Sequence, residues 1–245
     1  MSQFESQPLI GLTLEGLRKV AAECGMPPFS AKQMAQWLYV KRITEIDAMT
    51  DLSKRARAKL AEHGFTVGRQ QPLTAAESSD GTVKYLFEGV GGRDIESVYI
   101  PDRDRATLCV SSQAGCRMNC SFCMTGRQGF HGSLTAAGIM NQILSVPGSE
   151  SLTNLVFMGM GEPLDNLPPV LEAIEIITSK WGMAWSPKRI TVSTIGKLRE
   201  LRTLLDTTKV HIAISIHSPY PTERLALMPV EKAFPIKDVI SLLRQ

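Results

Sequence analysis

The first 65 residues of the chain carry apolar side chains at helical spacing. The first predicted helix has apolar residues three positions apart, at Leu14, Leu17 and Val20. Gly25 ends this helix, a second helix starts at Ser30, and a third covers residues 53–62. The pattern of residues 1–65 therefore predicts a small N-terminal helical domain.

The start of the second helix carries a capping signal. Ser30 and Gln33 have the spacing of a capping box, in which each side chain bonds to the backbone amide of the other residue. Phe29 precedes them, where a hydrophobic staple to Met34 is expected. We therefore expect Ser30 to cap this helix.

Residues 66–103 change to a strand pattern. Apolar residues alternate with others at Val83, Tyr85 and Phe87, after a turn at residues 80–81. Residues 95–100 form a further strand-like run. We expect a short antiparallel β linker element that joins two larger parts of the chain.

From residue 104 onward, strand-like and helix-like stretches alternate. The candidate strands, rich in Val and Ile, are residues 107–111, 154–158, 189–194 and 210–216. Strands of this kind separated by helices predict βα units and a parallel sheet. The fold class is therefore α/β, and residues 104–245 form its third and largest part.

A polar or glycine-rich segment follows each of these strands. The segments are a loop with three cysteines, then residues 159–163, 193–194 and 215–217. Ligands bind at the C-terminal ends of parallel strands in sheets and barrels of this class. We therefore expect the four segments to converge on one edge of the sheet.

The first segment, Cys116-Arg-Met-Asn-Cys120-Ser-Phe-Cys123, indicates a metal site. The spacing C-x3-C-x2-C supplies thiolates for three irons of a cubane iron–sulfur cluster, and it leaves the fourth iron open to a small molecule. Structural zinc instead takes four ligands, usually in paired short spacings, and here His131 would have to be the fourth. Ligand count and spacing favour the cluster, and zinc is the alternative.

Other residues near the strand ends are weaker candidates when each is taken alone. Gly161 and Glu162 indicate close backbone approach to a ligand and a carboxylate for an ammonium group, or else a tight turn with a solvated acid. Three polar residues are candidates only because they lie at strand ends, and these are Ser193, Ser215 and His217. Cys109 is by default a core cysteine, but it lies close enough to Cys116 to face the same cavity.

Composition and charge narrow the picture. The chain has 245 residues, 43% of them hydrophobic, so it can bury a sizeable core. Its net charge of +3 is weak evidence for nucleic-acid binding, and we interpret the basic residues of the third helix as a solvated face. Five cysteines, three of them clustered, indicate a reducing cytoplasm and no disulfide scaffold.

The sequence has no membrane-spanning apolar run of about 18 residues, and its N-terminus lacks the pattern of a secretion signal.

Longer motifs resemble a known family. The three-cysteine loop resembles the signature of the radical S-adenosylmethionine (SAM) enzymes. Residues 99–116, Gly126-Arg-Gln-Gly-Phe130 and Phe157-Met-Gly-Met-Gly-Glu-Pro-Leu164 make the whole chain similar to the RlmN/Cfr family. This resemblance implies a partial (β/α) barrel of the radical SAM type behind an RNA-binding-like N-terminal domain.

The resemblance also implies an activity. The family methylates an adenine of 23S ribosomal RNA, at C2 in the branch that this chain resembles more closely and at C8 in the alternative branch. The C2 branch acts on tRNA as well in bacteria. The cofactors are a [4Fe–4S] cluster and SAM, and a flavodoxin-type protein is the kind of electron donor expected. One SAM methylates a cysteine near the C-terminus, and the other is cleaved to a 5′-deoxyadenosyl radical.

Residue roles follow from the same resemblance. Cys116, Cys120 and Cys123 bind the cluster. The SAM contacts of the family fall on Gly161, Glu162, Ser193, Ser215, Ile216 and His217. Cys109 matches the cysteine that helps to resolve the protein–RNA adduct, and Glu96 aligns with a proton acceptor.

The chain departs from the family pattern near its end. No cysteine follows Cys123, so the methyl-carrying cysteine is absent, and four βα strands are visible where the family has about six. We expect a fragment or truncated product of an enzyme in preference to a natural short form, and we expect no RNA methylation by this polypeptide alone. The last strand, residues 210–216, is expected to be an exposed edge.

Overall fold

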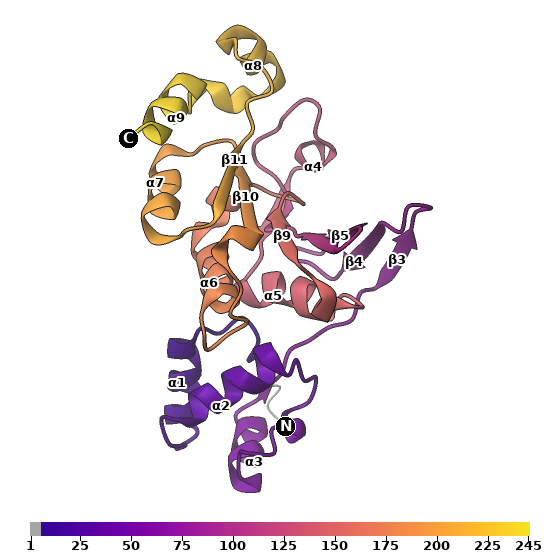
Figure 1. The fold of residues 1–245 in the computed structure, drawn as a ribbon, viewed down its shortest axis with the longest axis vertical. Coiled ribbons are helices and arrows are strands. Elements are labelled where there is room, and N and C mark those ends of the chain that lie inside the picture. The colour runs from indigo at the N-terminus through magenta and orange to yellow at the C-terminus, as the bar shows by residue number, and fades with distance from the viewer. Residues whose placement is uncertain (1–5) are drawn as a thin grey trace. The chain divides into compact units, whose positions relative to one another are not determined.

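The computed structural model describes residues 6–245, which divide into two compact units (Figure 1). The N-terminal unit comprises residues up to 71 together with residues 135–147 and 172–185. The sheet unit comprises residues 72–134, 148–171 and 186–245. The domain boundaries expected from the sequence, at residues 65 and 103, stay a prediction.

Helices form the N-terminal unit. They are α1 (Leu14–Glu23), α2 (Ser30–Ala35) with a π-helical turn (Gln36–Val40), a 3-10 turn (Ile46–Ala48), α3 (Lys54–Glu62) and α5 (Ala136–Ser145). Thr13 caps α1 by accepting a hydrogen bond from the Gly16 amide, and Ser53 caps α3 by accepting one from the Ala56 amide. The short strands β1 (Gln7–Pro8) and β2 (Phe65–Thr66) pair in parallel. The predicted helical N-terminal region is confirmed.

The capping box expected at Ser30 is wrong. Ser30 already lies inside α2, and its N–H donates to the Pro27 carbonyl, so the chain turns before Ser30 is reached. The Gln33 side chain donates instead to the Asp51 carbonyl, and Phe29 is 63% exposed rather than stapled onto Met34. The turn at residues 27–30 makes a side-chain cap unnecessary there.

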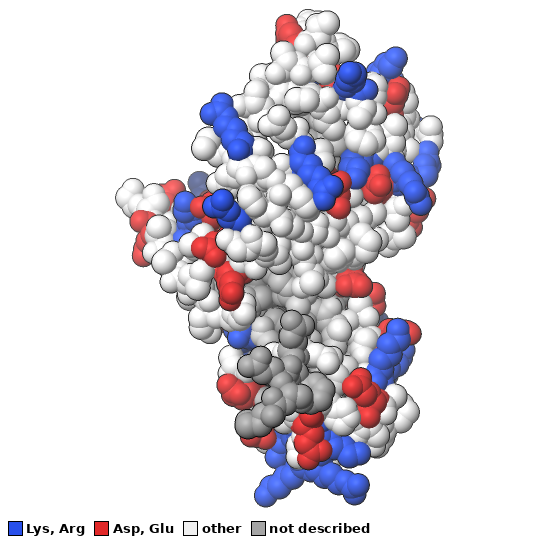
Figure 2. Space-filling view, turned by 180° about the vertical axis from the view of Figure 1, so that it is seen from behind, with Lys and Arg blue, Asp and Glu red and all other residues white. Residues whose placement is uncertain are grey.

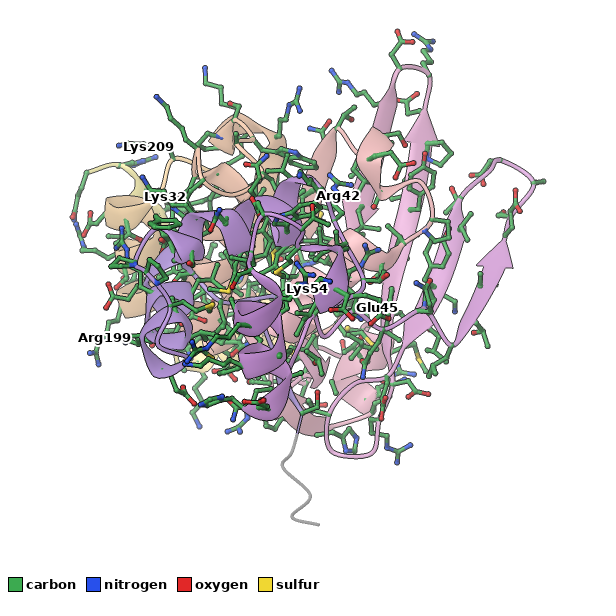
Figure 3. All side chains as sticks on the ribbon, turned by 90° about the horizontal axis from the view of Figure 1, so that it is seen from below. Lys32, Arg42, Glu45, Lys54, Arg199 and Lys209 are labelled. Atoms are coloured by element: carbon green, nitrogen blue, oxygen red, sulfur yellow. The ribbon has the colours of Figure 1, made fainter. Side chains whose placement is uncertain are left out.

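The basic residues of α3 have two different environments. The Arg57 guanidinium donates to the carbonyls of Met49 and Leu52, and Lys59 Nζ donates to the Cys24 carbonyl at 3.0 Å. Lys54, labelled in Figure 3, is exposed, as is Arg55. Figure 2 shows basic side chains at the end of the unit where α3 lies. The solvated-face interpretation is therefore wrong for Arg57 and Lys59, which bind the carbonyls of neighbouring segments.

A single mixed sheet of seven strands organises the sheet unit (Figure 1). Its order is β11 (His211–Ile214), β10 (Ile190–Thr194), β9 (Asn154–Phe157), β6 (Arg105–Cys109), β5 (Ile95–Asp102), β4 (Val83–Phe87) and β3 (Thr74–Glu77). The four strands from β6 to β11 in this order are parallel, and β3, β4 and β5 are antiparallel. The antiparallel element expected between residues 66 and 103 thus continues the parallel sheet through the β5–β6 pair.

Helices and turns connect the parallel strands. They include α4 (Met124–Arg127), the 3-10 turns at Ser149–Ser151, Pro163–Asn166 and Pro187–Arg189, α6 (Leu167–Thr178) and α7 (Leu198–Thr207). After β11 come α8 (Pro221–Leu227), a 3-10 turn at Pro229–Lys232 and α9 (Ile236–Leu243). A hairpin of β7 (Gln113–Gly115) and β8 (Phe130–Ser133) flanks the cysteine loop. Among the described residues, β11 pairs only with β10, so it is the edge strand that the sequence predicts.

Within residues 6–245, no helix combines the length and the apolar character that crossing a bilayer requires.

Candidate cofactor site at the strand ends

The segments that follow the parallel strands are hydrogen-bonded to one another. After β6 and β9, the Ser112 N–H donates to the Met160 carbonyl at 2.9 Å. After β10 and β11, the Ser215 N–H donates to the Thr194 carbonyl, also at 2.9 Å. Parallel strands end at one edge of a sheet, and these bonds show that the segments meet there.

The cysteine loop lies at this edge. Cys116 and Cys120 are buried, and Cys123 is half-buried at the start of α4. The Cys116 N–H donates to the Gly129 carbonyl, and the Cys123 N–H donates to the Cys120 carbonyl. Burial, together with the charges of Glu162 and the two other cysteines, raises the pKa of Cys116 to about 11. Binding a metal there must therefore displace a firmly held proton.

Apolar side chains surround the middle cysteine. Cys120 packs in a buried cluster whose other members are Ile195, Met228 and Val230. The next residue, Ser121, donates its N–H to the carbonyl of Leu227 in α8 at 2.9 Å. The segment between α8 and α9 therefore holds the cysteine loop and shields part of it from water.

Two glycines after β9 allow the backbone to approach the segment after β6. A Cβ atom on Gly159 would lie 2.7 Å from Ser111 Oγ. Gly161 has φ +96°, and a Cβ atom there would lie 2.6 Å from Gln113 Cβ. The close approach that the sequence indicates at Gly161 is thus made to this chain's own Gln113.

Glu162 is almost fully buried and is not the solvated acid of the alternative interpretation. Its Oε1 accepts hydrogen bonds from the Leu164 N–H and the Thr194 hydroxyl, and its Oε2 accepts one from the Ile195 N–H at 3.0 Å. Burial raises the pKa of Glu162 to about 7, and these three hydrogen bonds act in the opposite direction. The carboxylate ties the segment after β9 to the end of β10.

The predicted residues beyond β11 lie at the same edge. The His217 ring lies against Phe122 of the cysteine loop, with ring centroids 4.4 Å apart. His217 has φ +58°, an uncommon backbone conformation for a residue other than glycine. Ile216 is exposed, and the Ser215 backbone is bonded as described above. Ser193 is half-buried within β10, opposite Ala213.

Cys109 and Glu96 lie where the antiparallel part of the sheet meets the parallel part. Cys109 ends β6 and is opposite Val98 of β5 and Val156 of β9. Burial raises the pKa of Cys109, and a hydrogen bond from the Met158 amide opposes this. Glu96 in β5 forms an ion pair with Lys84 in β4 at 3.0 Å, and its carbonyl accepts a hydrogen bond from Ser111.

Sequence reasoning missed several polar residues of this edge. They are Gln113, Asp165, Thr194, Arg224 and Glu231. Gln113 Oε1 accepts from the Glu162 N–H, and Asp165 forms an ion pair with Lys197 at 2.6 Å. Their roles come from pairings between distant segments, for which the linear sequence carries no signal.

Comparison with known proteins identifies the family. Residues 7–65 match the family described as the ribosomal RNA large subunit methyltransferase N-terminal domain, and residues 110–245 match the radical SAM superfamily. A protein of Parabacteroides distasonis named "Probable dual-specificity RNA methyltransferase RlmN" is 56% identical over 241 residues, which are 98% of this chain and 70% of that protein. The chain belongs to the RlmN family of radical SAM methyltransferases.

Two further similar proteins agree with this assignment. The protein of the same name from Bacteroides fragilis is 53% identical over 97% of this chain and 69% of its own length. The crystal structure of a radical SAM methyltransferase from Sphaerobacter thermophilus superposes with a TM-score of 0.88 at 36% identity, covering 96% of this chain and 71% of that one. The predicted fold class, with its radical SAM α/β domain and helical N-terminal region, is confirmed.

Membership in this superfamily implies a [4Fe–4S] cluster and SAM as cofactors. The residues fit them. Three thiols come from one loop, which suits a cluster that takes one protein sulfur on each of three irons. The His131 ring contacts the Gln128 carbonyl at 2.9 Å.

Proposed function

We propose that this chain carries the catalytic site of an enzyme that methylates C2 of adenine in 23S ribosomal RNA and in tRNA, in the cytoplasm. The observation that carries this proposal is the meeting of the three-cysteine loop with the segments after β9, β10 and β11 at one edge of the sheet. The relatives at 53–56% identity are named dual-specificity RNA methyltransferases, which supports RNA as the substrate.

In this proposal Cys116, Cys120 and Cys123 hold the [4Fe–4S] cluster. When bound, the cluster supplies the electron that cleaves SAM to a 5′-deoxyadenosyl radical. The protein contributes position and shielding. Ile195, Met228 and Val230 exclude water from the Cys120 side of the loop, and an electron donor of the flavodoxin type has to approach from another direction.

Glu162 has capacity for one more hydrogen-bond donor. A carboxylate offers about four lone-pair sites. Two donors occupy Oε1 and one occupies Oε2, so one site remains for an ammonium group such as that of SAM. The other residues of the proposed SAM site are Gly161, Ser193, Ser215, Ile216 and His217.

Cys109 and Glu96 act on the RNA side of the proposed mechanism. Cys109 is half-buried at the end of β6, and we assign to it the resolution of the protein–RNA adduct. Glu96 is half-exposed beside Lys84, and we assign to it the acceptance of a proton from the base. The N-terminal unit is the proposed RNA-binding accessory domain. Its exposed basic residues include Lys32 and Lys54, which are labelled in Figure 3, and also Arg55.

Anaerobic reconstitution of the 245-residue chain tests the cluster and the reaction class. We expect about four irons per chain, a brown colour, and release of 5′-deoxyadenosine from SAM after reduction. Cys120→Ala should lose both iron and SAM cleavage, whereas Cys24→Ala, which changes the buried C-cap residue of α1, should keep both. One colourless zinc per chain would contradict the proposal and support a zinc-stabilised RNA-binding module.

Product analysis tests the finer assignment. The 245-residue chain is incubated with RNA, SAM and a reductant, and mass spectrometry of the RNA reports the position of any added methyl group. C2-methyladenine would support the C2 assignment, and C8-methyladenine would overturn it.

A further inference from the structure

Arg224 is a fully buried arginine in α8, with 0% of its surface exposed. Its guanidinium donates to the carbonyls of Ile216 at 3.1 Å, Ser215 at 3.2 Å and Ile195 at 3.3 Å. These three carbonyls belong to the segments that follow β10 and β11. One side chain therefore fixes the backbone on which the proposed SAM contacts Ser215, Ile216 and His217 lie.

Glu231 balances the charge of Arg224. Its Oε2 accepts a hydrogen bond from Arg224 Nη1, and both of its oxygens accept from the Ile236 N–H, at 3.2 and 3.0 Å. Glu231 is buried as well. The pair is thus removed from water. At such a buried site, solvent and salt screen charges far less than they do at the surface.

The same stretch of chain also contacts the cysteine loop. Met228 and Val230, which lie between Arg224 and Glu231, pack against Cys120, and Leu227 accepts a hydrogen bond from Ser121. Ile195, whose carbonyl accepts a hydrogen bond from Arg224, belongs to the same buried cluster as Cys120. A single packed residue therefore separates the Arg224 guanidinium from the middle cysteine.

We propose that the buried Arg224–Glu231 pair sets the reduction potential of the cluster, in addition to positioning the carbonyls after β10 and β11. This inference rests on the proposed cluster at Cys116, Cys120 and Cys123. A cluster gains one negative charge when it accepts an electron, and its potential depends on the charges and hydrogen bonds around it. Arg224 stabilises the reduced form, and Glu231 offsets part of that effect.

Single substitutions separate the two charges. Glu231→Gln keeps the shape and one oxygen that can accept from both Arg224 and the Ile236 N–H, while it leaves the positive charge unbalanced. Arg224→Gln removes the positive charge. The potential of the reconstituted 245-residue chain is measured by dithionite titration, with the reduced cluster followed by electron paramagnetic resonance.

Opposite shifts are expected from the two variants. Glu231→Gln should raise the potential and Arg224→Gln should lower it, each changing the ratio of reduced to oxidised cluster on the order of tenfold at a fixed potential. The double variant should fall between them. Damage to packing alone would move both single variants in the same direction.

Matched controls carry the same charge changes at exposed positions of the sheet unit. They are Glu223→Gln, one residue from Arg224, and Arg199→Gln in α7. Shifts in one direction for both buried variants, or shifts no larger than those of the controls, would overturn the inference. If Arg224→Gln fails to fold, the reduction potentials of Glu231→Gln and Glu223→Gln decide the question, and the rise for Glu231→Gln should be the larger. A wild-type chain that takes up no cluster would overturn the proposed function and this inference together.

Discussion

The Thr194 hydroxyl donates a hydrogen bond to Oε1 of Glu162, joining the last residue of β10 to the segment after β9. The same hydroxyl accepts a hydrogen bond from the Gly196 N–H at 3.0 Å. Both side chains are buried, so neither partner has water to replace a lost bond. Two strand ends that are far apart in the sequence are thereby held in one arrangement.

Thr194→Val should therefore destabilise the protein. Valine keeps the shape of threonine but leaves Glu162 and the Gly196 N–H without this partner, at an expected cost of about 1–3 kcal/mol in the free energy of unfolding. Urea denaturation measures the change. Thr191→Val, at a half-exposed position of the same strand, is the matched control and should change stability by about 0.5 kcal/mol or less. Equal effects of the two substitutions would contradict the role of the hydroxyl.

The buried Glu162 carboxyl predicts a pH dependence of stability in the metal-free protein. Burial raises its pKa from 4.5 to about 7, so the folded state holds this proton more tightly than the unfolded state does. Its contribution to stability is present at low pH and is lost as pH rises from about 4.5 through 7, by about 1.4 kcal/mol for each unit of pKa shift.

Comparison with a variant isolates this contribution. Glu162→Gln does not titrate, so the stability of the wild type relative to this variant should fall between pH 5 and pH 8. Unfolding free energies measured at each pH check the direction. A difference that grows with pH would mean that the three hydrogen bonds to Glu162 outweigh its burial.

Replacing Gly161 with alanine should destabilise the protein for two reasons that can be measured separately. Alanine at this position meets both an unfavourable positive φ and a collision with Gln113. Gly92→Ala is a matched control because Gly92 also has a positive φ but has no atom within 4 Å of the added Cβ. We expect Gly92→Ala to cost about 1–2 kcal/mol and Gly161→Ala to cost clearly more, by urea denaturation. Equal costs would show that Gln113 moves aside.

The cysteine loop and the parallel strands could be predicted from the sequence because both depend on local patterns. The spacing of Cys116, Cys120 and Cys123 is contained within eight residues, and Val- and Ile-rich runs mark the parallel strands. Among the described residues, β11 pairs with β10 alone, which agrees with the expected edge position.

The polar contacts behind the site could not be predicted in this way. Charged residues are rarely fully buried, so Arg224 in a short helix reads as a surface residue until its partners from three other segments are known. Such contacts depend on how distant segments meet, which no spacing encodes. The capping box at Ser30 failed for a different, local reason, since the turn from Pro27 to Ser30 removed the need for a cap.

The apolar contacts of Met228 are expected to stabilise the protein and to protect the cluster from oxygen. Its side chain is fully buried against Cys120, Ile195 and Val230. Met228→Ala should cost about 2–5 kcal/mol in unfolding free energy because it leaves a cavity, and it should open the cluster to oxygen. The half-life of the brown colour in air, measured beside urea denaturation, checks both effects. Leu225→Ala, at an exposed position of α8, should leave both unchanged, and a Met228→Ala cluster as durable as the wild type would show that this side does not protect it.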